Sequence, residues 1–113
     1  MALRPLCLGK VPNGWVVASE SCALDHIGAQ FEREIEPGEG VLITGSGPSS
    51  FRVATERKGA PCVFEHIYFS RPDSVMGGGL LYPIREAMGA QLSIEHPVEA
   101  DLVGGVPHSA TAA

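Results

Sequence analysis

Short apolar runs alternate with turn residues in the first half of the chain. Residues 6–11, apart from Lys10, and 15–18 are largely apolar, and Asn13-Gly14 between them tolerates positive φ, which predicts a β-hairpin. Residues 31–35 alternate as a half-buried strand would, and Pro37-Gly38 turns that strand. Closely spaced short strands of this kind are typical of an antiparallel sheet.

One helix and one more hairpin complete this half. Ser19 or Ser21 is expected to cap a short helix that ends at Gly28. Residues 41–44 and 51–54 predict a hairpin across the turn Gly-Ser-Gly-Pro. The first half should therefore consist of antiparallel strands around one helix.

The second half combines an aromatic stretch, a glycine run and a helical pattern. Residues 62–74 predict a buried strand that ends at Pro72, because proline cannot donate to a ladder. Gly77, Gly78 and Gly79 predict a flexible break. Residues 80–93 place apolar side chains at helical spacing, with Pro83 tolerated only in the first turn.

The last apolar run predicts a strand. Residues 100–103 form this run, and a Gly-Gly-Val-Pro turn follows. A helix, a strand and a glycine-rich loop in this order are typical of the first step of an α/β domain. A strand without neighbours exposes an unpaired edge, so we expect association or poor solubility.

Composition narrows the class of protein. The length of 113 residues and the hydrophobic content of 44% suit a single globular domain. A net charge of −5, without a Lys/Arg cluster, argues against nucleic acid and anionic membranes as partners. The sequence shows no signal-peptide pattern and no membrane-spanning run, and three cysteines make no secreted disulfide framework. We therefore expect a cytoplasmic protein.

Several segments together resemble one enzyme family. They are Val-Val-Ala-Ser-Glu-Ser-Cys-Ala-Leu-Asp at 16–25, the aromatic stretch 62–74, and His-Pro-Val-Glu-Ala-Asp-Leu-Val at 96–103 with Val-Pro-His-Ser after it. In order and spacing they resemble glutamine phosphoribosylpyrophosphate (PRPP) amidotransferase, also called amidophosphoribosyltransferase. The resemblance runs from about Arg4 to the last residue, and such collinear matches are more specific than any single motif.

The resemblance implies an α+β fold in three parts. Residues 1–55 would be the end of an N-terminal-nucleophile (Ntn) glutaminase domain, and 56–74 a linker. Residues 75–113 would be the first helix and strand of a type I phosphoribosyltransferase domain. The family converts PRPP and glutamine to 5-phosphoribosylamine, the first committed step of purine (IMP) biosynthesis. The resemblance further implies a homo-oligomer that uses Mg²⁺ and, in some members, a [4Fe–4S] cluster.

Two residues match functional positions of the family. Cys62 matches the first cysteine ligand of the cluster, and Ser109 matches a hydroxyl near Mg²⁺ and the pyrophosphate. Because such a cluster needs four thiolates and the chain has three cysteines, the chain cannot hold one alone, and a purely structural Cys62 stays open. The family usually has Asp where this chain has His108, so an acceptor is missing beside the metal position.

The chain by itself is expected to be inactive. Cys7 lies in an apolar run, where burial raises a thiol's pKa and makes it a poor nucleophile. The sequence has no adjacent Asp-Asp pair for a PRPP loop. The alternative is a non-catalytic truncated or split-gene module that associates with a partner fragment.

The remaining polar candidates favour structural roles. His26, His66 and His96 lack the spacing of a zinc site, so each is expected to be a core or surface residue. Arg71 and Asp73 are expected to stabilise a turn.

Overall fold

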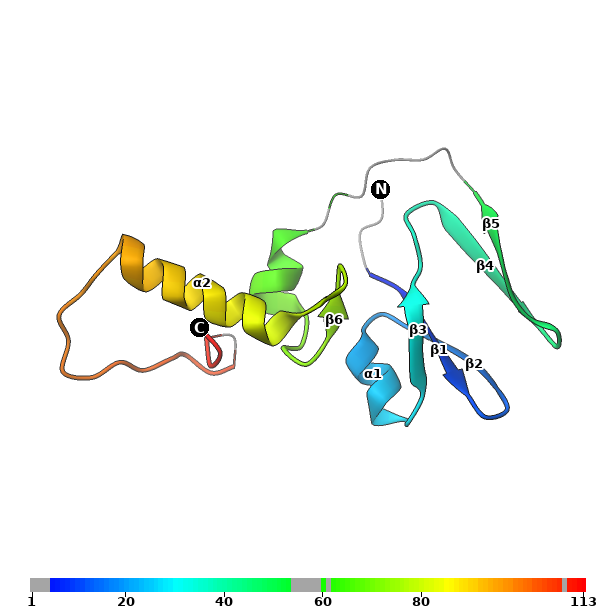
Figure 1. Ribbon diagram of the computed structural model, residues 1–113, viewed down its shortest axis with the longest axis horizontal. Coiled ribbons are helices and arrows are strands. Elements are labelled where there is room, and N and C mark those ends of the chain that lie inside the picture. Colours follow the sequence, from blue (N-terminus) through cyan, green and yellow to red (C-terminus); the bar gives the residue numbers. More distant parts are fainter. Residues whose placement is uncertain (1–4, 54–59, 61, 109) are drawn as a thin grey trace. The chain divides into compact units, whose positions relative to one another are not determined.

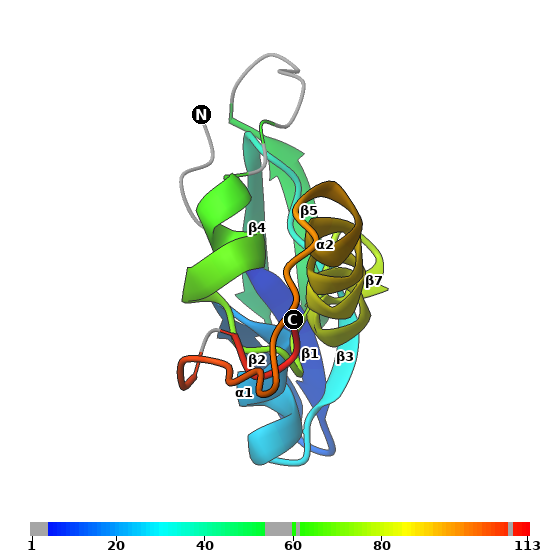
Figure 2. The ribbon, with the colours of Figure 1, turned by 90° about the vertical axis from the view of Figure 1, so that its left-hand side faces the viewer.

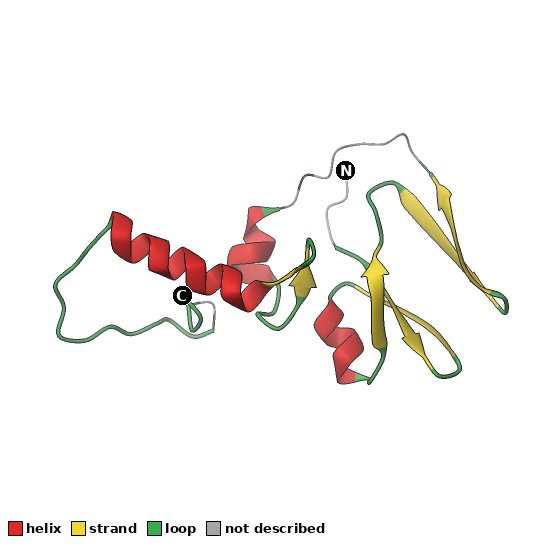
Figure 3. Ribbon diagram, viewed as in Figure 1, coloured by secondary structure: helices red, strands yellow, loops and turns green. Residues whose placement is uncertain are grey.

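The computed structural model describes residues 5–53, 60, 62–108 and 110–113. It consists of two compact units, Met1–Cys62 and Val63–Ala113. Strands dominate the first unit and helices the second (Figure 3). The predicted mixture of helices and antiparallel sheets is confirmed. The division falls within the predicted linker 56–74, while the assignment of each part to a domain stays a prediction.

A three-stranded antiparallel sheet organises the first unit (Figure 1). Its strands are β1 (Cys7–Val11), β2 (Gly14–Ala18) and β3 (Gln30–Glu34), in the order β2-β1-β3. The first predicted hairpin is confirmed, but the predicted reason for its turn is wrong. Val11 pairs with Gly14, so Pro12 and Asn13 make the turn, and neither Asn13 nor Gly14 has positive φ.

The helix α1 (Ser21–His26) ends where the sequence predicts. Gly28 has φ of +68°, which lets the chain turn back. Its N–H donates to Asp25 O at 3.0 Å, and the N–H of Ala29 donates to Leu24 O at 2.9 Å, so the last carbonyls are satisfied. The predicted cap at the other end is wrong. Glu20 holds the cap position with extended backbone and no side-chain cap bond, and Ser21 lies buried inside the helix.

The small core of this unit lies between α1 and the sheet. Cys7, Leu24 and Ala29 are buried there, and four partly buried apolar side chains surround them: Val11, Val16, Ala18 and Phe31. A Cβ on Gly9 would lie 2.9 Å from both methyl carbons of Leu24. Glycine at this position of β1 therefore lets the helix close against the strand.

The second hairpin joins β4 (Glu39–Thr44) to β5 (Gly47–Arg52). Its turn is shorter than predicted, since Thr44 pairs with Gly47 and only Gly45 and Ser46 lie between the strands. Gly47 has φ of +109°, which favours glycine. Thr44 Oγ1 lies 2.8 Å from Ser46 Oγ and donates to Gly47 O at 3.3 Å. These bonds stabilise the tight turn.

One ion pair ties this hairpin to the three-stranded sheet. Arg33 on β3 donates from both terminal nitrogens to Glu39 on β4, at 2.9 and 2.6 Å. Arg33 also donates to Ser50 Oγ on β5 at 2.8 Å, and Glu36 N donates to Glu39 Oε2 at 2.8 Å. These bonds, led by that from Arg33, hold the pKa of Glu39 at about 2.

The second unit begins with a helix where the sequence predicts a buried strand. η1 (Glu65–Phe69) is a π-helix that buries Glu65. The strand prediction is wrong because a short apolar run has no period that separates strand from helix. This segment turns its polar side inward, so the large side chains that suggested burial are exposed: Val63, Phe64, Ile67, Tyr68 and Phe69. The predicted turn at Pro72 is confirmed.

The predicted flexible break at the glycine run is also wrong. Gly77 and Gly78 form a two-residue turn with φ of +60° and +80°, which joins β6 (Val75–Met76) to β7 (Gly79–Leu80). Two consecutive positive φ angles are the signature of the primed turns that favour hairpins. The glycines here fix a turn.

The predicted long helix is confirmed as α2 (Leu81–Glu95), with Pro83 in its first turn. No side chain caps its start. Instead, Leu81 N donates to Ser74 O at 3.0 Å and Tyr82 N donates to Pro72 O at 2.8 Å. The turn that follows η1 therefore satisfies the first N–H groups of α2 with backbone carbonyls, and Pro83 has no N–H that needs an acceptor.

The chain after α2 forms no sheet within the described residues. Residues 97–108 run as a loop (Figure 2), and no ladder forms at the strand predicted for 100–103. The side chain of Leu102 is 89% exposed. A segment forms a strand only when it hydrogen-bonds to a second strand, and none of the described residues provides that second strand. In the described ranges, no helix combines the length and apolar character needed to cross a bilayer.

The ion pair of Arg33 and Glu39 predicts acid sensitivity. The folded pKa of Glu39, about 2, lies below its ordinary value of 4.5, so the unfolded chain binds the proton more readily. The stabilisation is complete above about pH 4.5 and is lost as the pH falls towards 2. Solvent screens the pair because the Arg33 side chain is 38% exposed, so we expect a loss of roughly 1 kcal/mol.

Urea unfolding at pH 6 and pH 3, followed by Trp15 fluorescence, measures this loss. Glu39→Gln should flatten the pH dependence, while Glu86→Gln on α2 should leave it as in the parent chain. If the parent chain and Glu39→Gln lost stability equally between pH 6 and pH 3, the acid sensitivity would not come from Glu39.

Candidate functional site

A buried arginine joins α2 to η1. Arg85 is only 4% exposed. Its Nε donates to His66 O at 2.7 Å and its Nη2 donates to Ser70 O at 2.6 Å. Ser70 in turn donates from Oγ to Glu65 Oε2 at 2.8 Å. The described residues thus bury a connected polar group between two helices of the second unit.

The π-helical pattern makes this contact available. Ser70 N donates to Glu65 O, five residues back, at 3.3 Å, so it does not use the carbonyl of His66. That carbonyl and Ser70 O end the helix, where a cation is favoured. Sequence reasoning missed Arg85. The available signal was its spacing of four from Leu81, which places both buried residues on one helix face.

The turn after η1 contains the predicted Arg71–Asp73 pair. Arg71 donates from Nε to Asp73 Oδ1 at 3.0 Å and from Nη2 to Oδ2 at 2.8 Å. The pair lowers the pKa of Asp73, but both side chains are more than half exposed. It is therefore a surface pair that stabilises a turn, as predicted.

The three cysteines lie in different environments. Cys7 on β1 is buried and lies 3.2 Å from Ala18 O, and burial, helped by Glu34, raises the pKa of its thiol to about 11. The prediction that Cys7 is a small buried apolar residue with a raised pKa is confirmed. Cys22 on α1 is half-buried, and Cys62 is exposed just before η1.

These positions do not form a cluster site. Within the described residues, no three His, Cys, Asp or Glu side chains are grouped so as to hold a metal ion. The residues present therefore do not fit a [4Fe–4S] cluster by themselves, since it needs four thiolates. Of the histidines, His26 ends α1 and His96 follows α2, while His66 lies in η1 and not in the predicted strand.

The described residues on either side of the second candidate are joined by local hydrogen bonds. Ser109 itself lies outside the described residues. Around it, Ala110 N donates to Val106 O at 3.1 Å and Thr111 Oγ1 donates to His108 O at 3.0 Å. A Cβ on Gly105 would lie 2.6 Å from Ala110 O, so this close approach needs glycine.

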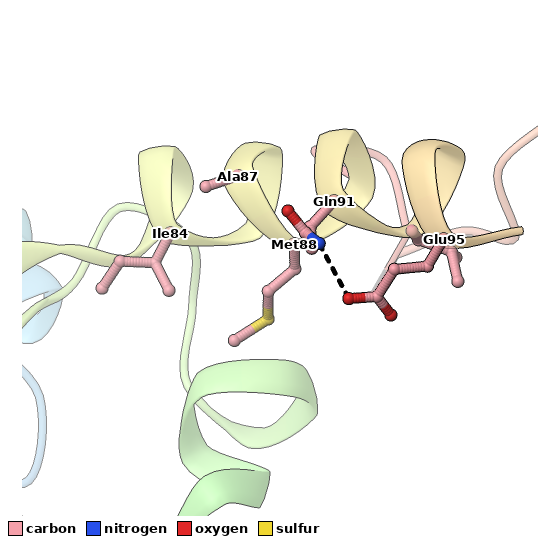
Figure 4. A pocket seen from close by; sticks show the side chains of 6 residues that line it. Ile84, Ala87, Met88, Gln91 and Glu95 are labelled. Carbon is pink, nitrogen blue, oxygen red and sulfur yellow. Dashed lines mark hydrogen bonds between the residues drawn. The ribbon is translucent and has the colours of Figure 1, made fainter.

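A shallow groove runs along α2 (Figure 4). Ile84 and Met88 provide its apolar wall, and Gln91 donates to Glu95 at 2.8 Å at its polar end. Ala87 and Leu92 complete the lining. Among its lining residues only Glu95 could act in proton transfer, and no second catalytic group accompanies it, which suits packing better than catalysis.

Comparison with known proteins relates the chain to one enzyme. It is 52% identical over 112 residues to amidophosphoribosyltransferase of Mycobacterium bovis and 42% identical over 109 residues to that of Archaeoglobus fulgidus. It is also 42% identical over 128 aligned positions to that of Mus musculus. By sequence, the chain is a homologue of part of amidophosphoribosyltransferase. These matches cover 96–98% of the chain but only 21–25% of the relatives' length.

Solved amidophosphoribosyltransferase structures agree. The glutamine PRPP amidotransferase of B. subtilis complexed with ADP and GMP is 44% identical, with a TM-score of 0.92 over 97% of the chain and 24% of its own. A structure described as the allosteric regulatory enzyme of purine biosynthesis gives a TM-score of 0.93 at 44% identity, over 98% of the chain and 24% of its own. No protein-family model matches the chain.

The cysteine environments predict different reactivity. At pH 8 a thiol with a pKa of about 11 is a thiolate in only about one molecule in a thousand, and Cys7 is also buried. Iodoacetamide should therefore alkylate the exposed Cys62 at least about 100-fold faster than Cys7. Peptide mass spectrometry over time measures both rates.

Unfolding in urea provides the control, because there the three cysteines should react at similar rates. Equal rates for Cys7 and Cys62 in the folded chain would contradict the buried position of Cys7.

Proposed function

We propose that the chain acts as part of an amidophosphoribosyltransferase, which makes 5-phosphoribosylamine from PRPP and glutamine in the first committed step of purine biosynthesis. The observation that carries this proposal is the match along nearly the whole chain, at 42–52% identity to curated relatives. Because the chain spans about a quarter of their length, the activity belongs to the longer protein. The 113 residues by themselves are inactive.

The proposal assigns each unit to one half of the enzyme. Residues 1–55 are the end of the Ntn glutaminase layer, and the antiparallel sheet with α1 on one side supports this. Residues 75–113 begin the type I phosphoribosyltransferase domain, and α2 followed by a loop closed at Gly105 supports this. The segment 56–74 joins them. The whole enzyme is a cytoplasmic homo-oligomer.

Two positions carry the proposed site. Ser109 follows His108 in the sequence, and a hydroxyl at this position suits Mg²⁺ because this ion prefers oxygen ligands. When bound, Mg²⁺ neutralises the charge of a pyrophosphate. Cys62 is exposed. A cysteine that binds a cluster together with ligands from other parts of the enzyme would be exposed in this piece of the chain.

The alternative is a non-catalytic truncated or split-gene module that associates with a partner fragment. No observation on the described residues favours it over the enzyme. The buried Cys7 and the ungrouped histidines and carboxylates are compatible with both.

A chimeric enzyme tests the proposed function. The chain replaces the matching quarter of the B. subtilis enzyme, and PRPP-dependent conversion of glutamine to glutamate is measured. We expect activity that rises about 10-fold or more with His108→Asp, which restores the acceptor that the family has beside the metal position. The matched control His96→Asp, after α2, should leave the activity unchanged.

A folded chimera that is inactive both with His108 and with His108→Asp would contradict the proposal. Circular dichroism and the oligomeric state show whether the chimera has folded.

A further inference from the structure

A glycine in the middle of α2 contacts the chain where it returns to this helix (Figure 1). A Cβ on Gly89 would overlap the carbonyl carbon of Ala113, and it would lie 2.7 Å from the Cα and 3.2 Å from the Cβ of that residue. Carbon atoms that are not bonded to each other pack at about 3.5–4.0 Å. Only glycine therefore lets the backbone of Ala113 lie this close to α2.

The helix itself gives no reason for a glycine at this position. Alanine is the best helix former, and glycine is one of the poorest because it loses more backbone entropy on folding. Gly89 lies inside the 15-residue helix, away from both ends, and its φ is not positive. The close approach of Ala113 is therefore the feature that requires glycine.

The segment that Gly89 contacts is held together by its own bonds and packing. Ala112, just before Ala113, is buried. Thr111 Oγ1 donates to His108 O at 3.0 Å, which ties the backbone at His108 to the residues that follow it. A shift of Ala113 away from α2 would therefore be transmitted to His108.

We propose that Gly89 is a positioning residue for PRPP: by letting Ala113 lie against α2, it holds the backbone at His108 where the pyrophosphate of this substrate binds. The inference rests on the proposed function, in which Mg²⁺ and the pyrophosphate lie beside position 108. A side chain at position 89 would move the segment by roughly 1 Å. A misplacement of this size can cost an enzyme about 100-fold in rate.

Binding of PRPP by the B. subtilis chimera tests the proposal. Titration calorimetry measures the Kd for PRPP in the presence of Mg²⁺, with Gly89 and with Gly89→Ala. We expect the substitution to weaken binding about 10- to 100-fold. Gly104→Ala is the matched control, because a Cβ there would have nothing within 4 Å and the φ of Gly104 is not positive. It should change the Kd by less than about twofold.

Amide exchange in the same chimera separates positioning from a general loss of stability. Alanine favours a helix more than glycine does, so the amides of Leu81 and Tyr82 at the start of α2 should exchange no faster in Gly89→Ala. The amide of Ala110, which donates to Val106 O at 3.1 Å, should exchange at least about 10-fold faster.

Four results would overturn the proposal. They are a Kd for PRPP that Gly89→Ala leaves unchanged, weaker binding accompanied by faster exchange at Leu81 and Tyr82, unchanged exchange at Ala110, and a folded chimera with Gly89 that does not bind PRPP. The proposed function fails separately. A chimera that binds PRPP with the expected dependence on Gly89 but lacks activity would contradict that function and leave the role of Gly89 standing.

Discussion

The buried guanidinium of Arg85 holds the second unit together. It spans from α2 to the end of η1 and donates to two carbonyls that the π-helical pattern leaves for it. Leu81 and Ala112 are the only apolar side chains buried in the described part of this unit, so apolar packing contributes little. A buried arginine without these acceptors would be costly, since an unpaired charge destabilises by several kcal/mol. The turn at Pro72, the start of α2 and the inward side of η1 are therefore mutually dependent.

This dependence explains which parts of the fold could be predicted from the sequence. Gly28, Pro83 and the two hairpins of the first unit rest on signals within a few residues, and the structure confirms these elements, although the first hairpin does not turn through the expected positive φ. η1 could not be predicted because Arg85, which donates to the carbonyls at its end, lies 15 to 19 residues further along the chain. The start of α2 likewise depends on carbonyls of the preceding turn, and no cap residue marks it.

The candidate site could be predicted only in part. The buried, unreactive Cys7 followed from the apolar residues around it, because burial alone raises a thiol's pKa. The positions of Cys62 and Ser109 came from family resemblance, and the chain supplies too few ligands to test either by geometry. The two units are best understood as pieces of a larger architecture. The first has a small apolar core, and the second has a buried polar bridge in place of one.

The stability of α2 in an Arg85→Met chain tests this account most directly. Methionine keeps much of the side-chain volume but leaves the carbonyls of His66 and Ser70 without their donor. The account predicts a loss of roughly 2–4 kcal/mol in the second unit, seen as faster amide exchange at Leu81 and Tyr82. Trp15 fluorescence should still report a folded first unit, and Arg71→Met, at the exposed pair, should change stability by no more than about 0.5 kcal/mol. Unchanged exchange at Leu81 and Tyr82 in Arg85→Met would contradict the central role of Arg85.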